Sequence, residues 1–121
     1  VKLMKAFYYL KSCSTCIKIM STIDLRSIHQ IDIKSTKISE NEVDKLKNIS
    51  GSYESLFNKR SQLYKKRNLK SKNLNELDFK NLIIEHYTFL KRPILVYEKK
   101  IFIGSEKKNI LDLQNFLNEQ I

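Results

Sequence analysis

The residues of this sequence best suited to chemistry are Cys13 and Cys16, which form one Cys-x-x-Cys pair and are the only cysteines in the chain. Such a pair can act as a redox-active dithiol: one thiolate attacks a substrate, and the other then attacks the adduct and releases the product. A disulfide across so short a loop constrains little of the unfolded chain, so a structural cross-link explains the pair poorly. The pattern predicts thiol redox chemistry, with Cys13 as the nucleophile and Cys16 as the resolving thiol.

Two other interpretations of the pair are a zinc site and a pair of ordinary core residues. Structural zinc takes four ligands, and the two histidines, His29 and His86, do not have the short spacing of zinc-finger ligands. A Cys-x-x-Cys inside a strand–helix–strand pattern is typical of redox proteins and favours that interpretation over a core role. We therefore predict no metal ion and no bound cofactor.

The residues around the pair predict such a strand–helix–strand unit. An apolar run at residues 3–10 predicts a buried strand, and isoleucines separated by polar residues at 28–33 predict a second one. Between them, apolar residues at helical spacing predict a helix from Ser14 to about Leu25. Cys13 then lies where the helix begins, and the unpaired N–H groups and partial positive charge there favour a thiolate.

The middle of the sequence predicts helices and no strand. Ser39 and Glu42 have the spacing of a capping box, and residues 52–68 predict two short helices. Asn75 can cap a later helix with His86 on its apolar face. We expect His86 to be a buried, hydrogen-bonded residue rather than a catalytic base.

The end of the sequence returns to strands and closes with a helix. Residues 93–97 and 101–103 predict two strands joined by a turn at Lys99 and Lys100. Ser105 is the expected cap of the last helix.

This order of elements predicts an α/β protein with a thioredoxin-like fold. A βαβ unit is followed by a ββα unit, and a helical insertion at about residues 38–90 separates the two halves. We expect residues 1–121 to form a single thioredoxin-like domain, since a chain of this length holds one core.

Two arginines are candidates for binding an anion near Cys13. Pro93 stands at the first residue of a predicted strand, where a missing N–H is tolerated, and in thioredoxin-like folds this proline is usually cis and lies against the active cysteine. Arg92 would then lie beside Cys13 and bind an oxyanion or stabilise the thiolate. A surface arginine is the alternative for Arg92, and a solvated helix residue is the alternative for Arg60.

Charge and hydropathy limit the remaining functions. The 121-residue chain has a net charge of +10, and its densest basic stretch runs from Lys59 to Lys72. We attribute this charge mainly to solvation of helix faces and do not expect direct nucleic-acid binding. The chain has neither an apolar run long enough to span a bilayer nor a signal-peptide pattern, so we expect no membrane association and a cytoplasmic protein.

The sequence resembles the arsenate reductase (ArsC), Spx and YffB group of bacterial proteins over nearly its whole length. The matching features are Cys13-x-x-Cys16, the helical insertion, Asn58-Lys59-Arg60-Ser61-x-x-Tyr64, Glu85-His86-x-x-x-Leu90-x-Arg92-Pro93-Ile94, and Gly104. The Arg-Pro-Ile segment with its preceding histidine is the most specific of these.

The resemblance implies two functions. In the reductases, Cys13 would attack arsenate while Arg92 and Arg60 hold the oxyanion, with glutathione and glutaredoxin or thioredoxin as the thiol reductant. In the Spx-type regulators, Cys13 and Cys16 would form a redox switch in a protein that binds the C-terminal domain of the RNA polymerase α subunit. We expect a thiol-dependent oxidoreductase acting on an oxyanion such as arsenate or on a small disulfide, with the redox-sensing regulator as the alternative.

Overall fold

The chain divides into two compact units in the computed structural model, which describes residues 4–120. The sheet unit comprises residues 1–36 and 92–121, and the helical unit comprises residues 37–91. The helical unit thus occupies the stretch of sequence where we predict the insertion.

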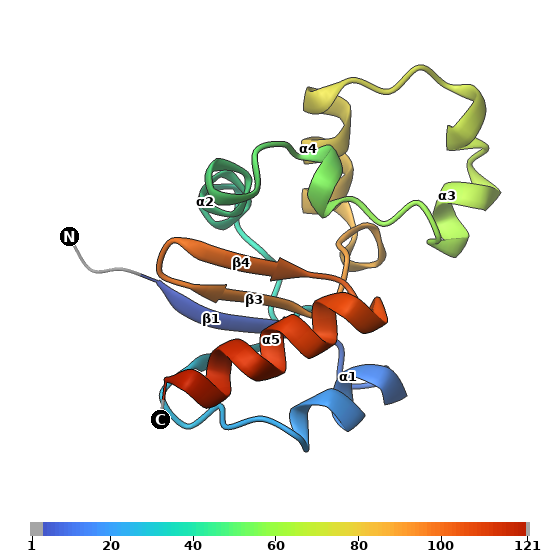
Figure 1. Ribbon diagram of the computed structural model, residues 1–121. Helices are drawn as coiled ribbons and strands as arrows, with labels where there is room; N and C mark the ends of the chain where they lie inside the picture. The colour runs from blue at the N-terminus through green and yellow to red at the C-terminus, as the bar shows by residue number, and fades with distance from the viewer. Residues whose placement is uncertain (1–3, 121) are drawn as a thin grey trace. The chain divides into compact units, whose positions relative to one another are not determined.

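The sheet unit is built on a four-stranded sheet with the order β2-β1-β3-β4 (Figure 1). The strands are β1 (Lys5–Tyr9), β2 (His29–Asp32), β3 (Ile94–Tyr97) and β4 (Lys100–Ile103). β1 pairs with β2 in parallel and with β3 antiparallel, and β3 pairs antiparallel with β4. The predicted order, βαβ followed by ββα, is confirmed.

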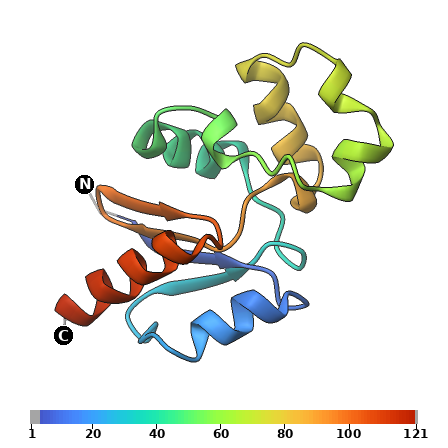
Figure 2. The ribbon, with the colours of Figure 1, turned by 45° about the vertical axis from the view of Figure 1, so that its right-hand side comes forward.

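Two helices, α1 (Ser14–Met20) and α5 (Lys107–Glu119), pack against one face of this sheet (Figure 2). Alternate strand residues point to opposite faces of a sheet, so Phe7 of β1 and Leu95 of β3 face these helices together. The buried residues of this core are Phe7, Ile19, Leu25, Ile28, Leu95, Leu113 and Leu117. The resulting apolar layer fixes the helix that begins at the cysteine pair.

Helix α1 is shorter than predicted: it ends at Met20, not near Leu25. The hydroxyl of Ser21 donates to the Lys18 carbonyl (2.6 Å), and the hydroxyl of Thr22 donates to the Ile19 carbonyl (2.7 Å). Hydroxyl side chains that bond to nearby carbonyls compete with helical hydrogen bonding and favour a helix end.

The hairpin turn and the last cap also differ from the prediction. Because Tyr97 pairs with Lys100, the turn consists of Glu98 and Lys99, and it lies one residue earlier than expected. Ser105 does not cap α5, whose N-cap is Glu106 and has no side-chain cap bond. At this helix start the Asn109 side chain instead donates to the Gly104 carbonyl (2.7 Å).

The helical unit is a chain of short helices with no strand among its elements. They are α2 (Glu40–Ser50), η1 (Glu54–Leu56), α3 (Gln62–Lys66), η2 (Leu69–Ser71), α4 (Glu76–Glu85) and η3 (Tyr87–Phe89). Both predicted caps are confirmed, since Ser39 and Asn75 each form a complete capping box. Gly51 ends α2 with φ of 100°, a left-handed conformation that favours glycine.

Aromatic rings form the core of the helical unit around Phe57. Its ring stacks on Phe89 at a centroid distance of 5.4 Å and contacts Phe79 at 4.9 Å. The prediction that His86 lies on the apolar face of α4 is wrong, because His86 follows the helix as its C-cap residue in an extended conformation. It is half-buried, and Nδ1 accepts from the Thr88 backbone N–H (3.1 Å), so the expected hydrogen bond is present.

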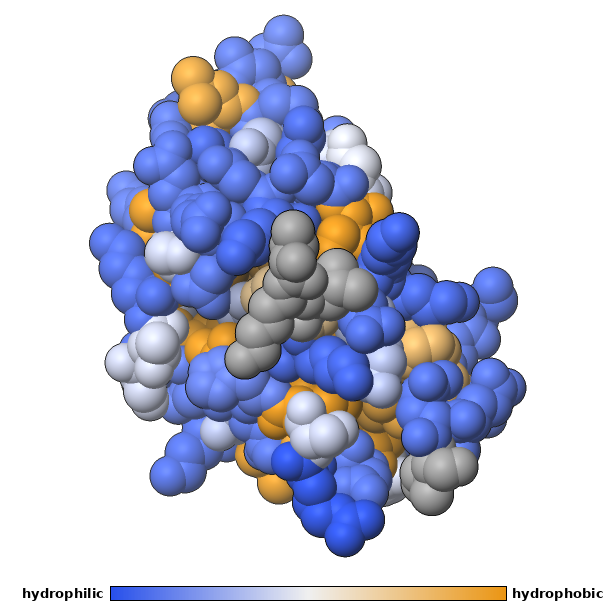
Figure 3. Space-filling model, turned by 90° about the vertical axis from the view of Figure 1, so that its left-hand side faces the viewer, coloured by the Kyte–Doolittle hydropathy of each residue, from blue (hydrophilic) through white to orange (hydrophobic). Residues whose placement is uncertain are grey.

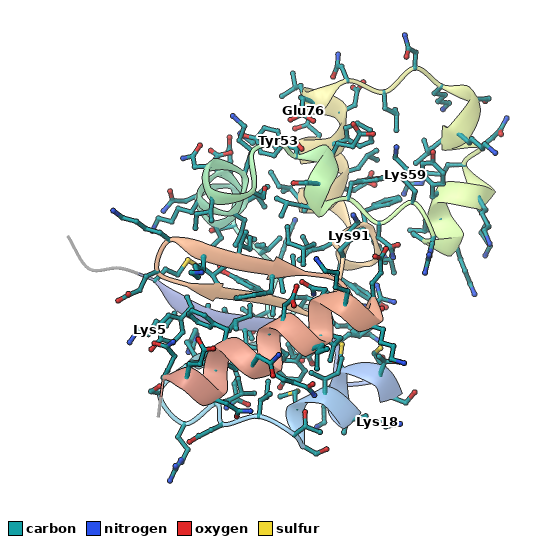
Figure 4. The ribbon with its side chains drawn as sticks, viewed as in Figure 1. Lys5, Lys18, Tyr53, Lys59, Glu76 and Lys91 are labelled. Atoms are coloured by element: carbon teal, nitrogen blue, oxygen red, sulfur yellow. The ribbon has the colours of Figure 1, made fainter. Side chains whose placement is uncertain are left out.

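Charged side chains tie the helices of this unit together. Lys80 of α4 bridges to Glu40 (2.9 Å) and Asp44 (3.0 Å) of α2. The carboxylate of Glu76 accepts from the backbone N–H groups of Tyr53 and Glu54, and Figure 4 shows Glu76 beside Tyr53.

Hydrophilic residues cover most of the face drawn in Figure 3. Among the described residues, the helices are too short or too polar to cross a bilayer.

Candidate active site

Cys13 is the N-cap residue of α1, as its place between strand and helix predicts. Its backbone is extended (φ −91°, ψ 111°), and its N–H donates to the Leu10 carbonyl (2.9 Å). The first N–H groups of a helix have no partner within the helix, so those of Thr15 and Cys16 are available to the Cys13 sulfur.

The environment of Cys13 favours its thiolate. Burial opposes ionisation, but the backbone and thiol hydrogen bonds from Cys16 outweigh it, with further help from the Thr15 N–H and the positive charge of Arg92. Together they hold the pKa of Cys13 below its usual range. The side chain is half-buried, so a reagent can reach the sulfur.

Cys16 has the opposite environment three residues later. Burial raises the pKa of Cys16 to about 11, and the negative charge of Cys13 adds to this rise, while a backbone hydrogen bond from Leu10 and the charge of Arg92 oppose it. The side chain is fully buried. Both cysteines are free thiols, and only Cys13 is both accessible and readily ionised.

Arg92 reaches this site through the strand register. β1 and β3 run antiparallel with Tyr8 opposite Ile94, so the end of β1 and the start of β3 lie at the same end of the sheet. The Arg92–Pro93 peptide bond is cis. The Nη1 atom of Arg92 is buried and has no hydrogen-bond partner among residues 4–120.

The turn that carries Cys13 has a carboxylate partner that the sequence analysis missed. Asp32, the last residue of β2, accepts a hydrogen bond from the Lys11 backbone N–H (3.3 Å). The available sequence signal was an acidic residue at a strand end, three positions before Ser35, whose hydroxyl also donates to Asp32 (2.6 Å).

Arg60 belongs to the helical unit, where its side chain is exposed. Residues 59–72 of that unit contain seven basic residues and no acidic ones. Lys59 pairs with Glu54, and Arg67 pairs with Glu85, so part of this charge is neutralised locally. The anion-binding role of Arg60 remains a prediction.

Over residues 4–120, no three or more His, Cys, Asp or Glu side chains gather closely enough to hold a metal ion.

A family model described as the ArsC family matches residues 8–113, which include the cysteine pair, the helical unit and most of α5. The chain belongs to the ArsC family. The matched range includes residues from both units and spans the whole helical unit.

Curated relatives of this ArsC-family chain are named as transcriptional regulators. Global transcriptional regulator Spx 2 of Bacillus cereus is 32% identical over 130 aligned positions, which cover 98% of this chain and 96% of the relative. Global transcriptional regulator Spx of Bacillus subtilis is 26% identical over 110 positions, covering 88% and 84%.

Two solved structures with this fold are described as a possible arsenate reductase and an arsenate reductase. A possible arsenate reductase from Streptococcus mutans has 29% identity and a TM-score of 0.72, with 93% of this chain and 98% of that chain covered. Arsenate reductase from Vibrio cholerae has 21% identity and a TM-score of 0.74 at the same coverage, a likeness that shows the fold alone. The predicted thioredoxin-like α/β fold is confirmed.

Proposed function

We propose that this ArsC-family chain is a thiol-dependent oxidoreductase in which Cys13 attacks and Cys16 resolves. The observation that carries the proposal is the different placement of the two thiols: Cys13 is a half-buried N-cap residue at the start of α1, whereas Cys16 is fully buried. Accordingly the pKa of Cys13 is lowered and that of Cys16 is raised to about 11. At neutral pH Cys13 is therefore the better nucleophile, and Cys16 remains a protonated thiol.

The same pair of steps suits an oxyanion or a small disulfide. With arsenate, the Cys13 thiolate forms a sulfur–arsenic bond while one arsenic–oxygen bond breaks, and the released oxygen takes up a proton from solvent and leaves as water. Cys16 then attacks the Cys13 sulfur, the sulfur–arsenic bond breaks, and its electron pair stays on arsenic, giving arsenite and a Cys13–Cys16 disulfide. With a small disulfide, one thiolate leaves at the first step and the second at the next. An external thiol, such as glutathione with glutaredoxin or thioredoxin, reduces the new disulfide.

The first step prepares the second. Part of the rise in the Cys16 pKa comes from the negative charge of Cys13 and from the hydrogen bond between the two sulfurs. Once Cys13 is bonded to a neutral group, as in a mixed disulfide, both contributions disappear, and Cys16 ionises more readily at the stage when it must attack. An arsenate adduct keeps negative charge on its oxygens, so there the hydrogen bond to the Cys13 thiolate is the contribution that is lost.

Arg92 supports an anionic substrate. A buried hydrogen-bond donor without a partner is costly, and Nη1 of Arg92 is such a donor among the described residues. A substrate oxygen would satisfy it with a charge-assisted hydrogen bond close to the attacking sulfur.

A second candidate function is redox-sensing transcriptional regulation. It is favoured by the 32% identity with Spx 2 of Bacillus cereus over 98% of this chain. In this case the same disulfide would be the signal rather than a catalytic intermediate. The partner would be the C-terminal domain of the RNA polymerase α subunit.

A coupled assay tests the first candidate. Arsenate-dependent NADPH oxidation is followed with glutathione, glutaredoxin and glutathione reductase for the wild type, Cys13→Ser and Arg92→Gln. We expect turnover that Cys13→Ser abolishes and whose KM for arsenate Arg92→Gln raises. Absence of arsenate turnover in the wild type removes the arsenate assignment, and a parallel assay with a small disulfide then tests the other substrate class.

A binding assay tests the second candidate function, redox-sensing regulation. The C-terminal domain of the polymerase α subunit is immobilised and offered the reduced and the oxidised protein, with Cys13→Ser as the form locked in the reduced state. Retention that depends on oxidation supports the regulator. Equal retention of all three forms contradicts a redox switch, and no retention contradicts this partner.

A further inference from the structure

Asp32 stands at the end of β2, directly opposite the end of β1. The parallel register pairs it with Tyr9, the last residue of β1, and the chain then turns towards Cys13. The backbone N–H of Ile33 continues this pairing by donating to the Tyr9 carbonyl (2.9 Å). Asp32 is therefore held beside the segment that leads into the cysteine pair.

The carboxylate of Asp32 is oriented by its own turn. Its Oδ2 accepts from the Ser35 hydroxyl (2.6 Å), and its Oδ1 lies 3.4 Å from the Lys34 backbone N–H. The Asp32 carbonyl accepts from the Thr36 N–H (2.9 Å), which closes the turn. These bonds orient the carboxylate so that its Oδ1 also accepts a hydrogen bond from the Lys11 N–H (3.3 Å).

The Lys11 N–H belongs to a second turn, which leads into Cys13, and it has no hydrogen-bond acceptor within that turn. Residues 10–13 form a β-turn closed by the Cys13 N–H on the Leu10 carbonyl. Such a turn uses the N–H of its fourth residue and leaves that of its second without a partner. Lys11 is exposed, and among the described residues the Asp32 carboxylate is the acceptor that this N–H contacts (3.3 Å).

Both thiols depend on this turn. Cys13 is its last residue and the N-cap of α1, and Leu10, its first residue, makes a backbone hydrogen bond with Cys16. A shift of the turn would therefore move Cys13 relative to the N–H groups of Thr15 and Cys16 that favour its thiolate.

We infer that Asp32 is a positioning residue for Cys13, whose carboxylate holds the turn that places the thiol at the start of α1. The inference rests on the proposed function, in which Cys13 is the reacting thiol. It makes a prediction opposite in sign to a simple charge effect. Removing a nearby negative charge would lower the pKa of Cys13, whereas releasing the turn raises it.

The test is the pH profile of Cys13 alkylation by iodoacetamide in the full chain, read at the Cys13 peptide by mass spectrometry. Asp32→Ala removes the acceptor, and Asp32→Asn keeps an acceptor oxygen without the charge. Asp24→Ala is the matched control, since Asp24 is an exposed carboxylate of the same unit that bonds to Arg26. Circular dichroism verifies that each variant is folded.

We expect Asp32→Ala to raise the midpoint of the profile by about 0.5 to 1 pH unit, while Asp32→Asn and Asp24→Ala stay close to the wild type. An unchanged or lowered midpoint in Asp32→Ala, or equal shifts in Asp32→Ala and Asp32→Asn, overturns the inference. Should Asp32→Ala fail to fold, Asp32→Glu keeps the charge and displaces the carboxylate, so an upward shift supports the inference and an unchanged profile overturns it.

The wild-type profile separates this inference from the proposed function. A wild-type Cys13 that titrates like a free thiol, at about 8.5, contradicts the proposed function itself. A lowered wild-type midpoint that the Asp32 variants leave unchanged contradicts only the positioning role.

Discussion

The two units of this chain are held together in different ways. In the sheet unit, a continuous apolar core lies between the sheet and helices α1 and α5, and the reactive thiol lies at one end of that framework. In the helical unit, short helices surround the rings near Phe57 and are joined by side-chain bonds such as those of Lys80. The groups that shift the pKa of Cys13 (Thr15, Cys16 and Arg92) all belong to the sheet unit.

This difference shows where the environment of the two thiols is encoded. Every residue that forms a hydrogen bond or charge interaction shifting the pKa of Cys13 or Cys16 belongs to the sheet unit. The helical unit contributes the exposed basic stretch at residues 59–72, which includes Arg60, the residue of this unit predicted to bind an anion. The following changes would break or sharpen this division.

The largest expected effect is on thiol reactivity. Cys13→Ser should slow alkylation by iodoacetamide at pH 7 by at least about a hundredfold, because the remaining thiol is fully buried and burial raises its pKa. Stopped-flow or mass-spectrometric rates measure this. The matched variant Cys16→Ser should keep the fast reaction, and comparable rates in the two variants would contradict the assignment of roles.

The next effect is on the stability of the helical unit. Phe57→Ala should lower the free energy of unfolding by about 3 to 5 kcal/mol, because it removes a fully buried ring that contacts three others. Urea denaturation measures the loss, and Phe57→Leu should cost less. Under native conditions the alkylation profile of Cys13 should stay unchanged, and a shift in that profile would show that the two units share the control of Cys13.

A smaller effect concerns the coupling between the two thiols. In Cys13→Ser, the pKa of Cys16 should fall below about 11, by about one unit, because the neutral hydroxyl removes the negative charge that raises it. The Cβ chemical shift of Cys16, followed by NMR against pH, gives the value. An unchanged pKa would mean that burial alone sets it.

The smallest effect compares two helix starts. Asn75→Ala should lower the free energy of unfolding by about 1 kcal/mol, because Asn75 forms a capping box with Asp78 at the start of α4. Ser105→Ala should cost almost nothing, since Ser105 is not the cap of α5. Equal losses in urea denaturation would contradict this distinction.

Much of the fold follows from local sequence signals. The spacing of Ser39 and Glu42 predicts a capping box, and the apolar run before Cys13 predicts the strand that precedes α1, because these signals act within one element. The end of α1 was harder to predict. Leu25 continues the apolar pattern because it is buried in the core outside the helix, while hydroxyls at Ser21 and Thr22 end the helix.

The candidate site also has features that local sequence predicts and features that only the strand register shows. The place of Cys13 at a helix start is a local property and was predicted correctly. The part played by Asp32 depends on the register between β1 and β2, which brings residues more than twenty positions apart side by side, and no local pattern shows it. The predicted position of His86 is wrong for a related reason. The spacing of His86 from the apolar residues of α4 fits the helix, but its ring accepts a hydrogen bond from Thr88 beyond the helix end.

The antiparallel register of β1 and β3 has one more consequence. It brings the residues just before Cys13 and just after Arg92 together by strand pairing, whatever the length of chain that joins them. The segment between β2 and β3 can therefore change in length or surface while the strand pairing still brings the start of β3 to the end of β1. On this plan, the environment that Arg92 gives to Cys13 is set by the sheet and not by the length of the inserted helices.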